Sequence, residues 1–175
     1  MIETERLVLR GWCSGDAVPF HALCNDTQVM EFLGPHQSME QVGAAIERQQ
    51  AFERHHRTCF WAVERKSDGT MIGFCGIKPG PPRTPLEGKF EIGWRLAREA
   101  WGHGFAREAA EASVNHGFSQ GMGSIWAMTV PANTRSWGLM ERLGMSRQAR
   151  LDFEHPAFAE GHPLRPHIVY AIARD

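Results

Sequence analysis

Residues 96–109 read LAREAWGHGFAREA, and this stretch marks the change from a strand to a helix. The residues before it, 90–96, alternate polar and apolar side chains, which predicts a strand. From residue 105 to residue 120, small side chains recur at helical spacing, at positions 106, 109, 110, 113 and 117. Such a narrow, flat face predicts a helix that lies close to a sheet.

Gly102 and Gly104 stand between the predicted strand and the predicted helix. A helix start exposes unpaired backbone N–H groups and a partial positive charge, and glycine lets a backbone approach a ligand closely. The loop is therefore suited to a pyrophosphate. A dinucleotide loop would need glycine where Arg107 stands, and a P-loop would need a Gly-Lys-Ser/Thr sequence that is absent. A plain tight turn is the alternative for both glycines.

Elements predicted on either side of this stretch give the order β-α-α-β-β-β-α-β-α-β-β. A capping box, Ser38 with Gln41, predicts the start of a helix that ends near His55. The other predicted helices are 17–24 and 137–143, and the other predicted strands are 6–12, 60–64, 71–77, 124–130 and 168–173. An antiparallel meander followed by a strand-helix-strand unit predicts one α+β (mixed α/β) domain over residues 1–175.

Composition excludes several classes of function. The net charge of −1 gives no broad basic field, so we expect no nucleic-acid partner. No apolar run approaches the roughly 20 residues that span a membrane, and the first residues carry no apolar signal core. Four cysteines without a Cys-x-x-Cys pair favour reduced thiols over a zinc site or a disulfide framework. We therefore expect a cytoplasmic protein with no membrane partner.

Five segments give the chain its resemblance to a known family. They are ETERLVLR at 3–10, EIGW at 91–94, AWGHGFAREA at 100–109, NTRS at 133–136 and MERLGM at 140–145. In this order they resemble the GCN5-related N-acetyltransferases (GNAT), and among them the RimJ/RimL-like branch. The resemblance implies the GNAT fold, a central, mixed and mostly antiparallel sheet flanked by helices. It also implies acetyl-CoA as cosubstrate and a primary amine as acceptor, either a protein N-terminus or a small molecule.

The resemblance also assigns cofactor-binding residues. In the family the strand corresponding to 90–96 splays from its neighbour, and the pantetheine arm inserts between them. The implied cofactor-binding positions are Trp94, Arg95, Leu96, Trp101, Gly102, His103, Gly104, Phe105, Ala106 and Asn133. Asn133 either bonds the pantetheine amide or caps the following helix. Glu99 replaces the Gln or Arg frequent in the family loop, which we expect to be tolerated because backbone N–H groups do most of the binding.

The catalytic groups depart from the family pattern. Met140 occupies the position where many relatives have a tyrosine that acts as general acid, and the single tyrosine is Tyr170. Ser136 is then the candidate that donates a hydrogen bond to the leaving sulfur, with a local capping role as its alternative. Glu91 is the candidate general base, with an outward-facing strand position as its alternative. This departure keeps open a second function, an acyl-CoA-binding module with impaired catalysis.

Histidines gather near the C-terminus, at 155, 162 and 167, among prolines. Their spacing matches no common zinc pattern, so we expect no metal. We expect this segment to close over the acceptor, with Glu154 or His155 touching the substrate, and a plain surface loop is the alternative. A homodimer is compatible with exposed sheet edges, and the sequence does not identify the acceptor amine.

Overall fold

The computed structural model describes residues 1–174 and contains one nine-stranded sheet in the order β1-β2-β3-β4-β5-β6-β9-β7, with β8 paired to β9. Every neighbouring pair is antiparallel except β5 with β6. The strands are β1 Ile2–Glu3, β2 Leu7–Arg10, β3 Phe60–Arg65, β4 Thr70–Pro79, β5 Phe90–Leu96, β6 Ser124–Thr129, β7 Ser146–Arg147, β8 Phe153–Glu154 and β9 Pro166–Ala173. The predicted α+β fold with a mixed, mostly antiparallel sheet is confirmed.

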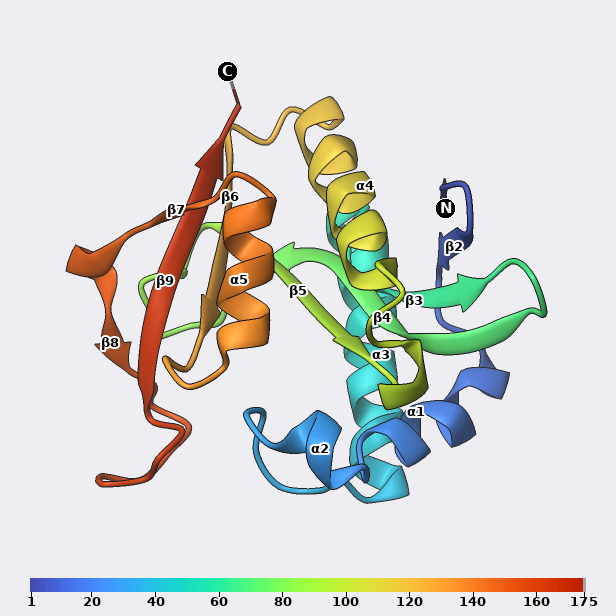
Figure 1. Ribbon diagram of the computed structural model, residues 1–175, viewed down its shortest axis with the longest axis horizontal. Coiled ribbons are helices and arrows are strands. Elements are labelled where there is room, and N and C mark those ends of the chain that lie inside the picture. The colour runs from blue at the N-terminus through green and yellow to red at the C-terminus, as the bar shows by residue number, and fades with distance from the viewer. Residues whose placement is uncertain (175) are drawn as a thin grey trace.

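Helices cover both faces of the sheet (Figure 1). They are α1 Ala17–Leu23, α2 Thr27–Met30, α3 Met39–His56, α4 Phe105–Ser119 and α5 Thr134–Arg142. Helix α4 shares one hydrophobic core with β3–β6, whereas α1 and α3 enclose a second core on the opposite face. In residues 1–174 no helix combines the length and the hydropathy needed to cross a membrane.

Local sequence signals place the two long helices. The capping box of α3 forms as predicted, since Ser38 Oγ accepts from Gln41 N and Gln41 Oε1 accepts from Ser38 N. The small face of α4 lies on the sheet, and Ala109, Ala110 and Ser113 are fully buried. A Cβ at Gly117 would lie 2.7 Å from Ile77 Cδ1, so glycine is what lets the helix approach so closely.

The structure corrects the boundary of α5. It begins at Thr134, three residues before the predicted start at 137, because Asn133 Oδ1 caps it by accepting from Ser136 N. Gly144 ends the helix as predicted, with φ of 80°. No bounds were predicted for the short helix α2 or for the two-residue strands β1, β7 and β8, because segments this short carry no periodic pattern.

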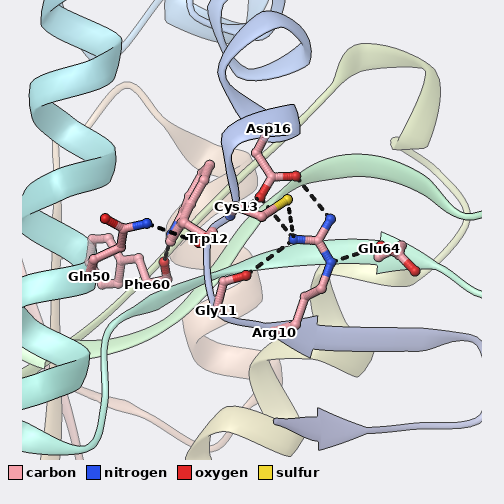
Figure 2. A network of polar contacts seen from close by, with 8 residues as sticks. All are labelled: Arg10, Gly11, Trp12, Cys13, Asp16, Gln50, Phe60 and Glu64. Atoms are coloured by element: carbon pink, nitrogen blue, oxygen red, sulfur yellow. Dashed lines mark hydrogen bonds and ion pairs between the residues drawn. The ribbon is translucent and has the colours of Figure 1, made fainter.

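A polar network around Arg10 fixes β2 to the start of α1 (Figure 2). Two guanidinium nitrogens donate to Asp16, Nη1 to Oδ2 at 2.8 Å and Nη2 to Oδ1 at 2.9 Å, and Nε donates to Glu64 at 2.8 Å. Nearby, Trp12 Nε1 donates to the Phe60 carbonyl at 2.6 Å, and Gln50 donates to the Trp12 carbonyl. These last two hydrogen bonds tie the Trp12 ring to the backbone of β3 and the Trp12 backbone to α3.

Breaking the buried side of this network should cost stability. Asp16 is 2% exposed, and Asp16→Asn should lower the free energy of unfolding by about 3 kcal/mol because it leaves Arg10 without its enclosed partner. That corresponds to a melting temperature about 6–12 °C lower for a chain of this length. The matched variant Glu64→Gln, whose side chain is more exposed, should cost about 1 kcal/mol or less. Equal losses in the two variants, measured by thermal unfolding, would contradict this account.

The same pair predicts the pH dependence. Burial by itself would raise the pKa of Asp16, but hydrogen bonds from Arg10 and from the Cys13 backbone bring that pKa below its ordinary value of 3.8. The stabilisation is therefore complete at neutral pH and is lost as the pH falls below about 4. The difference between wild type and Asp16→Asn should shrink over that range.

Candidate active site

A cleft of about 550 Å³ opens where β5 and β6 separate. These strands pair at a single position, Glu91 with Trp126, whereas β4 and β5 pair along their length from Gly73–Leu96 to Pro79–Phe90. Predicted site residues in the cleft lining are Glu91, Trp94, Arg95, Leu96, Trp101, Gly102, Gly104, Phe105, Ala106, Asn133 and Ser136. The strand separation that the resemblance implied is thus present.

The N-terminus of α4 faces this cleft. Gly102 and Gly104 have φ of 78° and 79°, in the left-handed region that favours glycine. The first intrahelical hydrogen bond at this end runs from Glu108 N to the Gly104 carbonyl, and no side chain of residues 1–174 caps the turn. The N–H groups of residues 105–107 therefore point out of the helix end, as an anion-binding site requires.

An ion pair with Arg6 compensates the negative charge of Glu108, so that this charge repels a bound anion less strongly. Glu108 is bound by Arg6, with Nη2 to Oε2 at 2.6 Å, and by the Thr4 hydroxyl. Arg6 Nη1 also donates to the His103 carbonyl at 2.9 Å. Burial alone would raise the pKa of Glu108, but these hydrogen bonds lower it, so the carboxylate stays ionised and paired. Arg6 thus links the first turn of α4 to the glycine loop. The sequence analysis did not assign this role.

Three arginines that were not predicted also line the cleft, Arg107, Arg135 and Arg142. The Arg135 guanidinium lies 4.2 Å from the Trp101 ring centroid and pairs with Glu31 of the segment after α2 at 3.5 Å. Trp101 in turn donates its Nε1–H to the Leu96 carbonyl at 2.9 Å. Arg107 likewise pairs with Glu111 at 2.7 Å. Three guanidinium groups in one cleft lining suit a ligand that carries several phosphates.

The catalytic candidates lie on opposite walls of the cleft. Glu91 on β5 is 8% exposed and forms an ion pair with Lys78. The Ser136 hydroxyl makes no hydrogen bond within residues 1–174, so it is not occupied in capping its own helix. Met140 is 2% exposed and lines the cleft beside it. Tyr170 is not part of the lining, and its hydroxyl donates to Glu141 at 3.1 Å.

Three predicted residues lie outside the lining. His103 is exposed, with its ring 5.8 Å from the Phe105 ring, and it contributes its carbonyl to Arg6. Glu154 on β8 pairs with Arg165 at 3.0 Å. His155 packs against His167, with ring centroids 4.7 Å apart. Contact of Glu154 or His155 with substrate therefore stays a prediction, and no cluster of three metal-ligating side chains occurs in the part of the chain that the structure describes.

Comparison with known proteins decides the family. The family model described as an acetyltransferase (GNAT) domain matches residues 6–146. The chain belongs to the GNAT acetyltransferases. This GNAT protein is 33% identical over 146 residues to the uncharacterized protein YkkB of Bacillus subtilis, with 81% of this chain and 83% of YkkB covered. The resemblance to the RimJ/RimL-like branch is confirmed as well.

Solved structures share the fold of this GNAT chain. An acetyltransferase (GNAT family) from Bacillus anthracis has a TM-score of 0.80 at 24% identity, with 98% and 97% of the two chains covered. The ribosomal-protein-S5-alanine acetyltransferase from Vibrio fischeri has a TM-score of 0.77 at 20% identity, with 99% and 96% covered. The spermidine N-acetyltransferase from Vibrio cholerae, solved with CoA and spermine, has a TM-score of 0.73 at 19% identity, with 97% and 96% covered.

The glycine loop provides a test of ligand binding. Gly104→Val places a β-branched residue at a φ of 79°, which strains the helix start, so we expect acetyl-CoA to bind at least tenfold more weakly by isothermal titration calorimetry. Gly121→Val is the matched control, since Gly121 has a φ of 85° just beyond the other end of α4 and open space around it. Equal losses of affinity in both variants would show that the loss comes from general backbone strain in the protein and not from a change in the glycine loop.

Proposed function

We propose that this GNAT protein transfers an acetyl group from acetyl-CoA to a primary amine. The observation that carries the proposal is the opening between β5 and β6, which leads from the uncapped start of α4 to Glu91 and Ser136. A thioester carried along this opening would lie between the phosphate-binding end and the candidate catalytic groups. The CoA-bound structure of the spermidine enzyme from Vibrio cholerae supports the choice of cofactor.

The cofactor would be held mainly by backbone. The N–H groups at the start of α4 would bind the pyrophosphate, and Arg107, Arg135 and Arg142 would neutralise the phosphate charges. The separated edge of β5, at Trp94–Leu96, would pair with the pantetheine arm as a neighbouring strand does. Asn133 would add its side-chain amide, because the amide oxygen caps Ser136 N and the NH₂ group has no partner within residues 1–174.

The chemistry follows from the groups on the two walls. The neutral amine attacks the thioester carbonyl, the C–N bond forms, and the C–S bond breaks. After the C–N bond forms and before the C–S bond breaks, the carbonyl oxygen carries a negative charge. Backbone N–H groups of β5 would stabilise that oxygen. Glu91 would accept the amine proton, directly or through water, and the ion pair with Lys78 would hold its carboxylate in place. Ser136 would donate a hydrogen bond to the departing sulfur.

The alternative function is a domain that binds acyl-CoA without efficient turnover. Met140 favours it, because this buried thioether replaces the tyrosine acid of many relatives and cannot donate a proton. The two functions predict the same cofactor binding. They differ in whether thiol is released from acetyl-CoA when amines are supplied, and that assay decides between them.

Ser136→Ala tests the mechanism itself. Loss of one hydrogen bond to the leaving sulfur, worth about 1 kcal/mol, should lower kcat roughly five- to tenfold and leave acetyl-CoA affinity unchanged. Ser146→Ala, at an exposed serine on β7 away from the cleft, is the matched control and should leave kcat at the wild-type value. An unchanged kcat in Ser136→Ala would remove Ser136 from the mechanism, and no thiol release in wild type with any amine would favour the binding domain.

A further inference from the structure

A second cavity of about 180 Å³ adjoins the cleft, on the face of the sheet that α1 and α3 cover. Phe60, Phe74 and Arg95 line both spaces, so the two are neighbours that share these side chains as a common wall. The remaining walls of the second cavity come from Trp12, Phe20, Gln37, Ala45, Arg48 and Gln49. None of its lining residues is acidic, and two are arginines.

Arg95 reaches this cavity because side chains alternate along β5. Trp94 and Leu96 pack into the core beneath α4, so Arg95 points to the opposite face, together with Gly93 and Glu91. Its guanidinium carbon lies 5.4 Å from the Phe74 ring centroid, the ring with which it shares this wall. The Arg95 side chain therefore lies on the face away from the three arginines that suit the cofactor phosphates.

The Arg95 guanidinium lacks a charged partner. No carboxylate of residues 1–174 lies within 4 Å of it, and its Nε is enclosed without a hydrogen-bond partner. Nη1 donates to Cys24 Sγ at 3.1 Å. Burial raises the pKa of that thiol, so the sulfur is uncharged at neutral pH and is a weak acceptor. Burial likewise lowers the pKa of Arg95, which reflects the cost of a cation without compensation.

A partly buried cation of this kind is costly unless an anion binds it. Glu91, the one acidic residue of the cleft lining in the described chain, is already paired with Lys78. A polycationic acceptor would therefore find few negative groups here and a repelling guanidinium. Gly93 and Arg95 are two residues apart on one strand, about 7 Å. An amine placed near Gly93 can thus belong to the same small molecule as an anion placed at Arg95.

We propose that the acceptor is a small amine that also carries a carboxylate, of the amino-acid or short-peptide class, and that Arg95 binds this carboxylate. This inference rests on the proposed acetyl transfer and names its acceptor class. The planar guanidinium matches a carboxylate with two parallel hydrogen bonds. Phe60, Phe74 and Trp12 provide apolar walls for the carbon skeleton, and the hydrogen bond from Trp12 Nε1 to the Phe60 carbonyl holds the Trp12 ring in place.

Matched pairs of acceptors test the proposal. Wild-type protein is assayed for thiol release from acetyl-CoA with free amino acids and dipeptides, each beside its C-terminal carboxamide. We expect kcat/KM for the best carboxylate to exceed that for its carboxamide at least 100-fold, which equals about 2.8 kcal/mol. In Arg95→Met this ratio should fall to about 1, because kcat/KM for the carboxylate falls while kcat/KM for the carboxamide does not. Arg95→Lys should restore part of the ratio. Arg54→Met, at an exposed arginine of α3 outside both cavities, should keep the full ratio.

Affinity for acetyl-CoA, measured for each variant, separates the two hypotheses. Equal rates for both members of every pair, an unchanged ratio in Arg95→Met, or acetyl-CoA binding with no reaction of any carboxylate would overturn the acceptor class while leaving the cofactor site in place. Failure of wild type to bind acetyl-CoA would instead overturn the proposed function. If Arg95→Met does not fold, the wild-type ratio and Arg95→Lys still decide the outcome.

Discussion

A single paired position, Glu91 with Trp126, joins the two halves of the sheet. On one side, β4 and β5 pair along their length; on the other, β6 and β9 pair from Ser124–Ala173 to Thr129–Ile168. Each half therefore has its own strong pairing, and the parallel contact between them can end early without loss of the fold. The cleft, and the placement of the candidate residues Glu91 and Ser136 in its lining, follow from this early end.

The opening has a physical cost that a ligand can offset. Backbone groups on a separated strand edge need partners, and an unpaired buried group costs free energy. Trp101 satisfies the Leu96 carbonyl within the protein. The uncapped end of α4 adds N–H groups of the same kind. A ligand with amides along one part and phosphates at one end matches both sets, which is why the open edge and the helix start point to one cofactor.

Much of this arrangement could be predicted from local sequence, and the rest depends on tertiary contacts. The glycine loop, α4 with its small face and the capping box of α3 each have a local physical cause, and all three form. The start of α5 was placed too late because Asn133 was assigned to the cofactor in preference to its alternative role as the helix cap. Arg107, Arg135 and Arg142 were missed because no periodic pattern marks a residue that faces a cleft. The role of the Arg95 side chain was missed for another reason, since the cofactor assignment concerned its backbone and the alternation along β5 does not show which cavity lies on that face.

Thermal unfolding of the wild-type protein with acetyl-CoA, and separately with NAD and ATP, tests whether the protein binds acetyl-CoA specifically. A ligand present at 100 times its Kd adds about 2.7 kcal/mol, which should raise the melting temperature by roughly 5–11 °C for a chain of this length. We expect that rise with acetyl-CoA alone. No rise at saturating acetyl-CoA, or an equal rise with NAD or ATP, would contradict the claim that the opening between β5 and β6 is an acetyl-CoA site.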